Sequence, residues 1–275
     1  MSFGILNNIP ALFAENALNG TQLALNTTLQ QLATGMRINS GATDPAGLAI
    51  ANGLGANIAA LSQSIHNAND GVGSLQVADG ALSQVSTLLN TAVSIAAEAA
   101  TGTVSSAQRD SLNAEYQAIL AEINRIGGST SYNGTLVFTA STTSIYLTDA
   151  TAAGSSTITS SVGALSSTTL ALNATTLAGT DGTAAQTAIT AINAAIQTVS
   201  NNRGTLGAAI NRLRDAAAVM GTQVENLTAA QNNIMAADIP TAVSNLSRQS
   251  VMNQTGMAAL AQANSLEQSI LKLLQ

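Results

Sequence analysis

Residues 54–96, LGANIAALSQSIHNANDGVGSLQVADGALSQVSTLLNTAVSIA, decide the fold class of this chain. Apolar residues recur along this stretch at alternating spacings of four and three positions, which is the seam of a coiled coil. The seam includes Leu54, Ile58, Leu61, Ile65, Val72 and Leu75. Upstream, Asp44 and Pro45 are suited to the N-cap and the first helical position. The pattern therefore predicts one helix of roughly 65 Å.

A second pattern of the same period covers residues 192–234 and predicts another long helix. Its seam includes Ile210, Leu213, Met220, Val224 and Leu227. Residues 101–103, Thr-Gly-Thr, interrupt the first helix, and Ser105 with Gln108 forms the capping box of a shorter one. That shorter helix is expected to end at the glycine pair 127–128 and to return antiparallel to the first.

The two ends of the chain are patterned as helices but carry almost no charge. Residues 1–43 contain only Glu15 and Arg37 as charged side chains, and residues 235–275 contain only four. Because a helix that faces water normally has a charged outer face, these helices suit burial against other copies of the chain. The expected subunit-packing residues are Leu18, Leu25, Leu29, Leu32, Val243, Leu246, Leu266, Ile270 and Leu273. The chain is thus interpreted as a subunit of a polymer.

The middle of the chain has a different character. Residues 136–138, 145–147 and 157–159 are short strand candidates separated by Ser, Thr, Gly and Ala, which predicts a small surface segment. The expected division is into a terminal core helix (1–43), a long helix with its return helix (44–128), a variable segment (129–186), a second long helix (187–234) and another core helix (235–275). The fold class expected is mainly α, a long antiparallel helical rod with paired terminal helices and a small surface insert that contains a β-hairpin.

The composition argues against several classes of function. Charged residues are 8% of the chain and the net charge is −6, with Lys272 as the single lysine, so a nucleic-acid partner is not expected. Cysteine is absent, which removes disulfides and thiolate metal sites. No cleavable signal peptide and no membrane span are visible, so membrane insertion is not expected.

The isolated titratable residues favour structural roles, and neither an enzyme nor a cofactor is expected. His66 is the only histidine and cannot form a metal site alone, and Asp79 and Glu115 lack a supporting catalytic constellation. Arg203 lies in the second seam, where a lone charge sets register or pairs across an interface. Its expected partner is Glu115 or Glu122.

Several stretches then resemble bacterial flagellins, in order along the chain. They are LATGMRINS (32–40), DPAGLAI (44–50), NDGV (69–72), DGAL (79–82), NRI (124–126), YNG (132–134), ENLTAA (225–230) and GMAALAQAN (256–264). The resemblance covers roughly residues 1–138 and 187–275. It implies a subunit that polymerises helically into the extracellular flagellar filament, alone or with paralogous flagellins.

The same resemblance implies partners: the type III flagellar export apparatus, an export chaperone, the filament cap and hook-junction proteins. A hook–filament junction protein and an adhesive surface filament remain the alternatives. The zinc protease found in the insert of some flagellins would need a His-Glu-x-x-His helix, which a chain with one histidine cannot supply.

Two features of the resemblance concern the outer surface. Many flagellins carry charged residues, needed for recognition by an animal Toll-like receptor, where this chain has an altered stretch. Its residues are Asn90, Thr91, Val93, Ser94 and Ile95. Weak recognition is therefore expected, because lost arginines usually remove the strongest anchors. The Ser/Thr-rich segment could carry O-linked glycans, but the sequence does not identify which positions.

Overall fold

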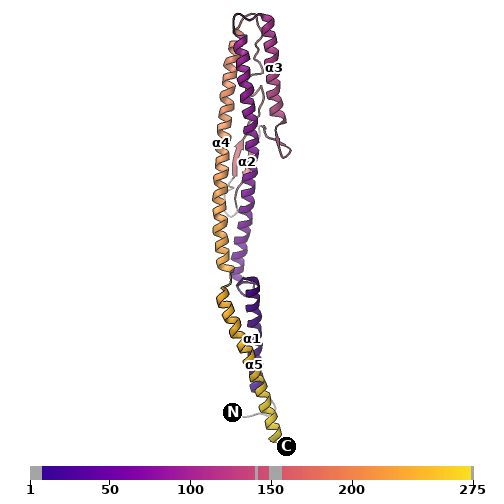
Figure 1. The fold of residues 1–275 in the computed structure, drawn as a ribbon, viewed down its shortest axis with the longest axis vertical. Helices are drawn as coiled ribbons and strands as arrows, with labels where there is room; N and C mark the ends of the chain where they lie inside the picture. The colour runs from indigo at the N-terminus through magenta and orange to yellow at the C-terminus, as the bar shows by residue number, and fades with distance from the viewer. Residues whose placement is uncertain (1–7, 140–141, 149–156, 274–275) are drawn as a thin grey trace. The chain divides into compact units, whose positions relative to one another are not determined.

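The protein is described by a computed structural model over residues 8–139, 142–148 and 157–273 (Figure 1). The helices described are α1 (Ile9–Thr34), α2 (Pro45–Ala99), α3 (Ser106–Ser129), α4 (Thr183–Met235) and α5 (Ile239–Leu273). The strands are β1 (Ser131–Tyr132), β2 (Thr135–Leu136), β3 (Thr142–Tyr146) and β4 (Thr157–Ser161). The mainly α class with short β elements is confirmed.

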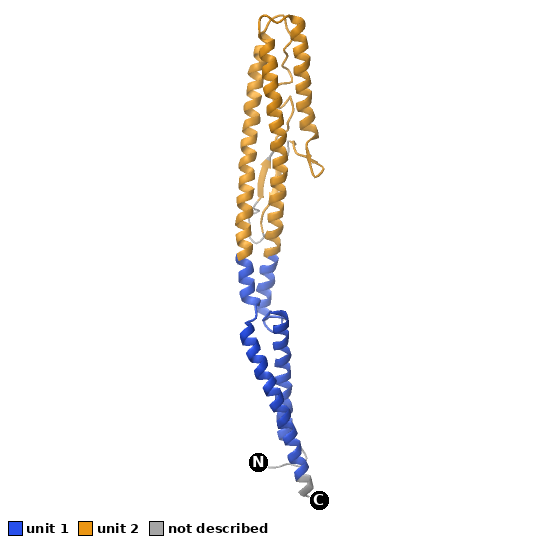
Figure 2. Cartoon of the chain, viewed as in Figure 1, with its two compact units in different colours: residues 1–56, 226–275 blue, residues 57–225 orange. Residues whose placement is uncertain are grey.

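The chain divides into two compact units (Figure 2). The first unit contains residues 1–56 and 226–275, and the second contains residues 57–225. In the first unit α1 packs along α5, with Asn253 Nδ2 donating to Gln22 Oε1 at 2.9 Å. The predicted pairing of the terminal helices is therefore confirmed.

The predicted helix starts are also present. The Asp44 carboxylate accepts the backbone N–H of Gly47 at 2.8 Å, and Pro45 is the first residue of α2. At the start of α3, the N–H of Gln108 donates to Ser105 Oγ at 3.3 Å, and Gln108 Oε1 accepts the N–H of Ser105 at 2.9 Å. Both long helices exceed the expected lengths, because α2 spans 55 residues and α4 begins at Thr183.

The second unit places α2, α3 and α4 side by side, with the segment between α3 and α4 packed onto them (Figure 1). Helix α2 buries a wider face than its seam, because a second series at seven-residue spacing is also buried. That series is Ser64, Gly71, Ala78, Val85, Ala92 and Ala99. Its mostly small side chains allow the β segment and α3 to approach α2 closely.

Glycines of α2 receive side chains from the β segment. A Cβ built on Gly71 would overlap the Ile145 side chain, and one built on Gly73 would lie 3.1 Å from the Tyr132 hydroxyl. Most of these neighbours belong to β3 and β1, and Leu213 of α4 lies 3.4 Å from the Cβ built on Gly71. The absence of a side chain at Gly71 thus allows both the β segment and α4 to approach α2.

The β segment consists of two hairpin-like pairs. Strands β1 and β2 pair antiparallel, with Ser131 opposite Leu136, around a turn at Asn133 (φ 50°) and Gly134 (φ 77°). These positive φ values suit the Asn-Gly turn that the sequence signals. Strands β3 and β4 pair antiparallel, with Ile145 opposite Ile158.

The segment after α3 is not simply a surface insert. Apart from Leu136, its described Leu, Ile and Val side chains are buried, including Leu165, Leu170, Leu172 and Leu177, whereas most of its described Ser and Thr side chains remain exposed. The Tyr116 and Thr175 hydroxyls lie 2.5 Å apart, and the Asn113 side chain accepts the N–H of Leu177 at 2.9 Å. The segment lies on the surface of the helices as expected, and its aliphatic residues are buried because the face of the helices beneath them is apolar and must be covered.

Candidate functional site: the faces of the terminal helices

The paired terminal helices leave large apolar side chains exposed. Phe13 is 71% exposed and Leu23 is 70% exposed on α1. The other exposed apolar residues of the pair include Ile9, Leu12, Leu29, Val243, Val251, Met252, Met257 and Leu266. Two helices can bury only one stripe each, so apolar residues elsewhere around these near-neutral helices are left uncovered by the described residues of the pair. Such a surface is typical of a self-association site.

The predicted packing residues fall into two groups. Leu18, Leu25, Leu32 and Leu246 are half-buried, and Leu18 lies beside Gly256 of α5. Leu29, Val243 and Leu266 are exposed. The positions of the Ile270 and Leu273 side chains lie outside the described part of the structure. The predicted set therefore combines residues that hold the pair together with residues free to meet another copy.

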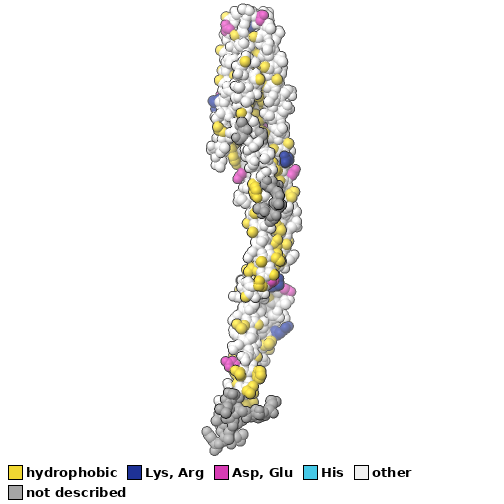
Figure 3. Space-filling model, turned by 180° about the vertical axis from the view of Figure 1, so that it is seen from behind, with side chains coloured by type: hydrophobic (Ala, Val, Ile, Leu, Met, Phe, Trp, Pro, Cys, Tyr) yellow, Lys and Arg dark blue, Asp and Glu magenta, His cyan; other side chains and the backbone are white. Residues whose placement is uncertain are grey.

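One face of the molecule shows how few charges the surface carries (Figure 3). Uncharged polar atoms and apolar side chains dominate this view, with scattered Lys, Arg, Asp and Glu. Such a surface provides little like-charge repulsion between copies.

Arg37 and its neighbours connect the ends of α1 and α4 within the first unit. The Arg37 guanidinium donates to the Ile234 carbonyl at 2.8 Å, and the Arg37 N–H donates to Met235 O at 2.6 Å. The N–H of Ala237 donates to Gly35 O at 2.9 Å, where Gly35 has a φ of 68°. The carbonyls at the end of α4 are thus satisfied by a cation and a backbone donor.

Asp238 caps the start of α5. Its carboxylate accepts the Thr241 hydroxyl at 2.7 Å and the Thr241 N–H at 3.3 Å. These hydrogen bonds, the hydroxyl one first, lower the pKa of Asp238 below its ordinary value. The carboxylate form is therefore the one that fits the cap.

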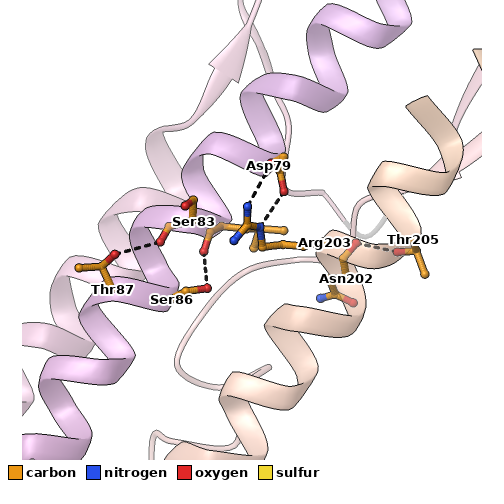
Figure 4. Close-up of polar contacts among 8 residues, drawn as sticks. Asp79, Ser83, Ser86, Thr87, Asn202, Arg203 and Thr205 are labelled. Carbon is orange, nitrogen blue, oxygen red and sulfur yellow. Dashed lines mark hydrogen bonds and ion pairs between the residues drawn. The ribbon is translucent and has the colours of Figure 1, made fainter. Parts of the chain in front are cut away.

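Within the second unit, Arg203 of α4 forms an ion pair with Asp79 of α2 (Figure 4). Arg203 Nε lies 2.7 Å from Asp79 Oδ1, and Nη2 lies 3.3 Å from Oδ2. The expectation that Glu115 or Glu122 would pair with Arg203 is wrong, because Glu122 forms an ion pair with Arg125, its neighbour on α3, at 2.6 Å. The hydrogen bonds that Arg203 donates to Asp79 raise the pKa of Arg203, while those that Arg125 donates to Glu122 lower the pKa of Glu122.

Arg109 is a buried residue that the sequence patterns did not reveal. Its guanidinium donates to the carbonyl of Ala99 at 2.9 Å, of Thr101 at 3.1 Å and of Thr180 at 3.3 Å. One cation thus satisfies the carboxyl end of α2 and holds the chain that leads into α4. Arg109 lies four residues after the N-cap Ser105, and this position in the sequence does not indicate that it binds distant backbone carbonyls.

The predicted seam residues occupy the interior to different degrees. Leu61, Val72, Leu75, Leu213 and Met220 are buried. Leu54, Ile58, Ile65, Ile210, Val224 and Leu227 are half-buried. In the altered receptor stretch, Asn90, Thr91 and Ser94 are exposed, Val93 is half-buried and Ile95 is buried. Ile95 is therefore unavailable as a direct contact for a receptor.

The described residues do not bring together three or more His, Asp or Glu side chains that could hold a metal ion. None of the described helices combines the length and hydropathy needed to cross a membrane. The fold and site thus define a mainly helical protein whose two termini form one unit with uncovered apolar faces.

Comparison with known proteins agrees with this class. Residues 5–143 match the bacterial flagellin N-terminal helical region, and residues 189–274 match the bacterial flagellin C-terminal helical region. The chain belongs to the bacterial flagellin family. This is a family of structural proteins.

Individual relatives match over part of their length. A flagellin of Salmonella muenchen is 42% identical over 133 residues, which is 48% of this chain and 26% of the relative. A flagellin of Escherichia coli O127:H6 is 40% identical over 130 residues, covering 47% of this chain and 24% of the relative. The matched region thus spans about a quarter of the length of these relatives. A crystal structure of Bacillus cereus flagellin aligns with a TM-score of 0.49 and 30% identity, covering 60% of this chain and 94% of that one.

Proposed function

We propose that this chain polymerises through α1 and α5 into the filament of a bacterial flagellum, the structure that drives swimming. The observation that carries the proposal is the uncovered apolar surface of the terminal pair, which includes Phe13 and Leu23. Family membership supports the same function.

The energetics favour association of many copies. Full burial of a Leu, Val or Phe side chain contributes about 1.5–3 kcal/mol. Association costs on the order of 4–15 kcal/mol in lost translational and rotational freedom. The exposed apolar residues of α1 and α5 are numerous enough to exceed this cost when several neighbours cover them.

The proposal extends to partners and location. As a filament subunit the chain is exported through the flagellar type III apparatus with an export chaperone, and it joins a structure bounded by hook-junction and cap proteins. The filament itself is extracellular. Membership of the flagellin family supports these partners.

Removal of the apolar surface tests polymerisation. Phe13→Asp or deletion of residues 266–275 should leave a folded monomer that does not polymerise, because a charge, or the loss of the last part of the chain, interrupts the apolar face. Sedimentation and electron microscopy would measure filament formation, and circular dichroism would check the helices. Asn90→Asp, which adds a charge at an exposed position of α2, is the control and should still give filaments. Normal filaments from both altered proteins would contradict the proposal.

We also propose that a Toll-like receptor recognises this flagellin weakly. Asn90, Thr91 and Ser94 offer uncharged side chains on the exposed face of α2, so strong Arg-centred contacts are not available there. A reporter-cell assay with the purified monomer measures this directly. Activation equal to that of the Salmonella muenchen flagellin would refute it.

A further inference from the structure

The charged side chains of the terminal helices are not all paired within the subunit. The charged residues of α1 and α5 whose side chains the structure describes are Glu15, Arg248 and Glu267, and Asp238 directly precedes α5. Asp238 caps α5, and Glu267 accepts a hydrogen bond of 2.8 Å from Asn8. Glu15 and Arg248 are both exposed, and neither has a hydrogen bond or ion pair with another described residue.

Glu15 and Arg248 cannot meet within one copy. Helices α1 and α5 run antiparallel, with Gln22 opposite Asn253 and Asn8 bonded to Glu267. This register places Glu15 opposite approximately residue 260, about twelve residues beyond Arg248. At 1.5 Å per residue the axial separation is roughly 18 Å, which is too far for an ion pair.

The structure leaves room beside Arg248. This side chain lines a hollow of about 350 Å³ between α1 and α5. The α1 wall of the hollow consists of small residues: Ala17, Gly20, Thr21 and Ala24. None of these four residues carries a carboxylate that could pair with the guanidinium. An acidic side chain of another copy can therefore approach Arg248 through the hollow.

We propose that Arg248 of one copy forms an ion pair with Glu15 of a neighbouring copy, and this inference rests on the proposed polymerisation. When apolar faces around a charge are buried, an unpaired charge is costly, whereas an Arg–carboxylate pair satisfies both groups. Glu15 and Arg248 are complementary, and each lacks a partner among the described residues of its own subunit. The pair sets the axial register between copies, with the neighbour's α1 displaced by roughly 18 Å from the subunit's own.

Charge exchange tests the pair. Glu15→Arg and Arg248→Glu should each raise the critical concentration for polymerisation about tenfold or more, because each places like charges together. The double variant Glu15→Arg/Arg248→Glu should return to within about threefold of the unaltered chain, because the pair is restored in reverse. Both residues are exposed in the free subunit, and circular dichroism should show that all variants remain helical.

Cysteine cross-linking provides an independent readout, since the natural chain has no cysteine. Copolymers of Glu15→Cys and Arg248→Cys chains should form a cross-linked heterodimer with a short bismaleimide, whose spacer replaces the reach of the two longer side chains that a direct disulfide could not span. Asn16→Cys in place of Glu15→Cys is the control, because the adjacent position points about 100° away around α1 and should cross-link far less.

The outcomes separate the two proposals. If the unaltered chain polymerises but the single charge reversals have no effect, or the double variant is no better than the worse single one, the ion pair is refuted and polymerisation stands. If the unaltered chain does not polymerise at all, the proposed function fails and the ion pair fails with it.

Discussion

The Arg109 guanidinium lies 2.9 Å from the carbonyl oxygen of Ala99, ten residues earlier in the chain. The same group binds the carbonyls of Thr101 and Thr180, so it joins the end of α2, the connection to α3 and the approach to α4. Arg109 is only 3% exposed. A buried arginine that binds backbone carbonyls stabilises three chain segments at once.

Replacement of Arg109 by Met should therefore destabilise the second unit. The buried Ala99 carbonyl loses its donor, which costs about 1–3 kcal/mol, while water can partly replace the donor at the part-buried Thr101 and Thr180 carbonyls. A total loss of roughly 2–4 kcal/mol is therefore expected. Urea denaturation followed by circular dichroism measures the change. Arg125→Met is the control and should change stability little, because Arg125 is exposed. Equal stability of the two variants would contradict the assigned role of Arg109.

Two adjacent glycines at the end of α3 should respond differently to alanine. A Cβ at Gly127 would overlap the Leu165 carbonyl oxygen, whereas a Cβ at Gly128 meets nothing within 4 Å. Gly127→Ala should destabilise by about 1–3 kcal/mol through forced displacement of the packed segment. Gly128→Ala should be neutral or stabilise by up to about 1 kcal/mol, because alanine favours a helix. Thermal unfolding would measure the transition temperatures of both variants. Equal transition temperatures would show that residues 162–182 do not pack against Gly127 as described.

The Asp79–Arg203 ion pair should contribute modestly to stability. Each side chain is 38% exposed, so solvent screens the interaction and a coupling of about 0.2–1 kcal/mol is expected. A double-mutant cycle with Asp79→Asn and Arg203→Gln measures this coupling. The coupling should decrease as sodium chloride rises from 0.1 to about 1 M, because the Debye length falls from about 10 to 3 Å. A larger coupling that salt does not change would indicate a pair more buried than the structure shows.

The Asp238 cap should make the start of α5 sensitive to acid. Hydrogen bonds from Thr241 lower the pKa of Asp238 in the folded state, so its stabilising effect is present above the unfolded pKa, near 3.8. The effect is lost as the pH falls below 3.8 and through the lower folded value. Hydrogen exchange of the Thr241 amide between pH 5 and about pH 2 would follow this loss. Asp238→Asn keeps a capping side chain but has no group that titrates in this range. In this variant the exchange of the Thr241 amide should not show the part of the pH dependence that comes from protonation of Asp238.

The local features of the fold follow from short stretches of sequence. The Asp44-Pro45 start, the Ser105–Gln108 box and the Asn133-Gly134 turn each act through bonds to atoms a few residues away. The coiled-coil period likewise predicts long helices without knowledge of their neighbours. For the same reason the near-neutral terminal helices could be identified as candidate association surfaces.

The partner of Arg203 could not be chosen in advance. Several carboxylates lie at comparable positions on helices expected to be adjacent, and the register of α2 against α4 selects Asp79. The carbonyls that Arg109 binds could not be predicted either, because every residue has the same backbone acceptor. The small-residue series that contains Gly71 and Ala78 does have a seven-residue signal, which could have revealed the wider buried face of α2.

By itself the sequence determined where the helices begin, how their apolar positions repeat and how little charge the terminal helices carry, since these are properties of neighbouring residues. Only the tertiary structure decided that the leucines after α3 are buried and that Glu15 and Arg248 lie too far apart to pair in one copy. The physical reason is that burial and ion pairing depend on which distant segments meet, and many registers are compatible with the same local pattern.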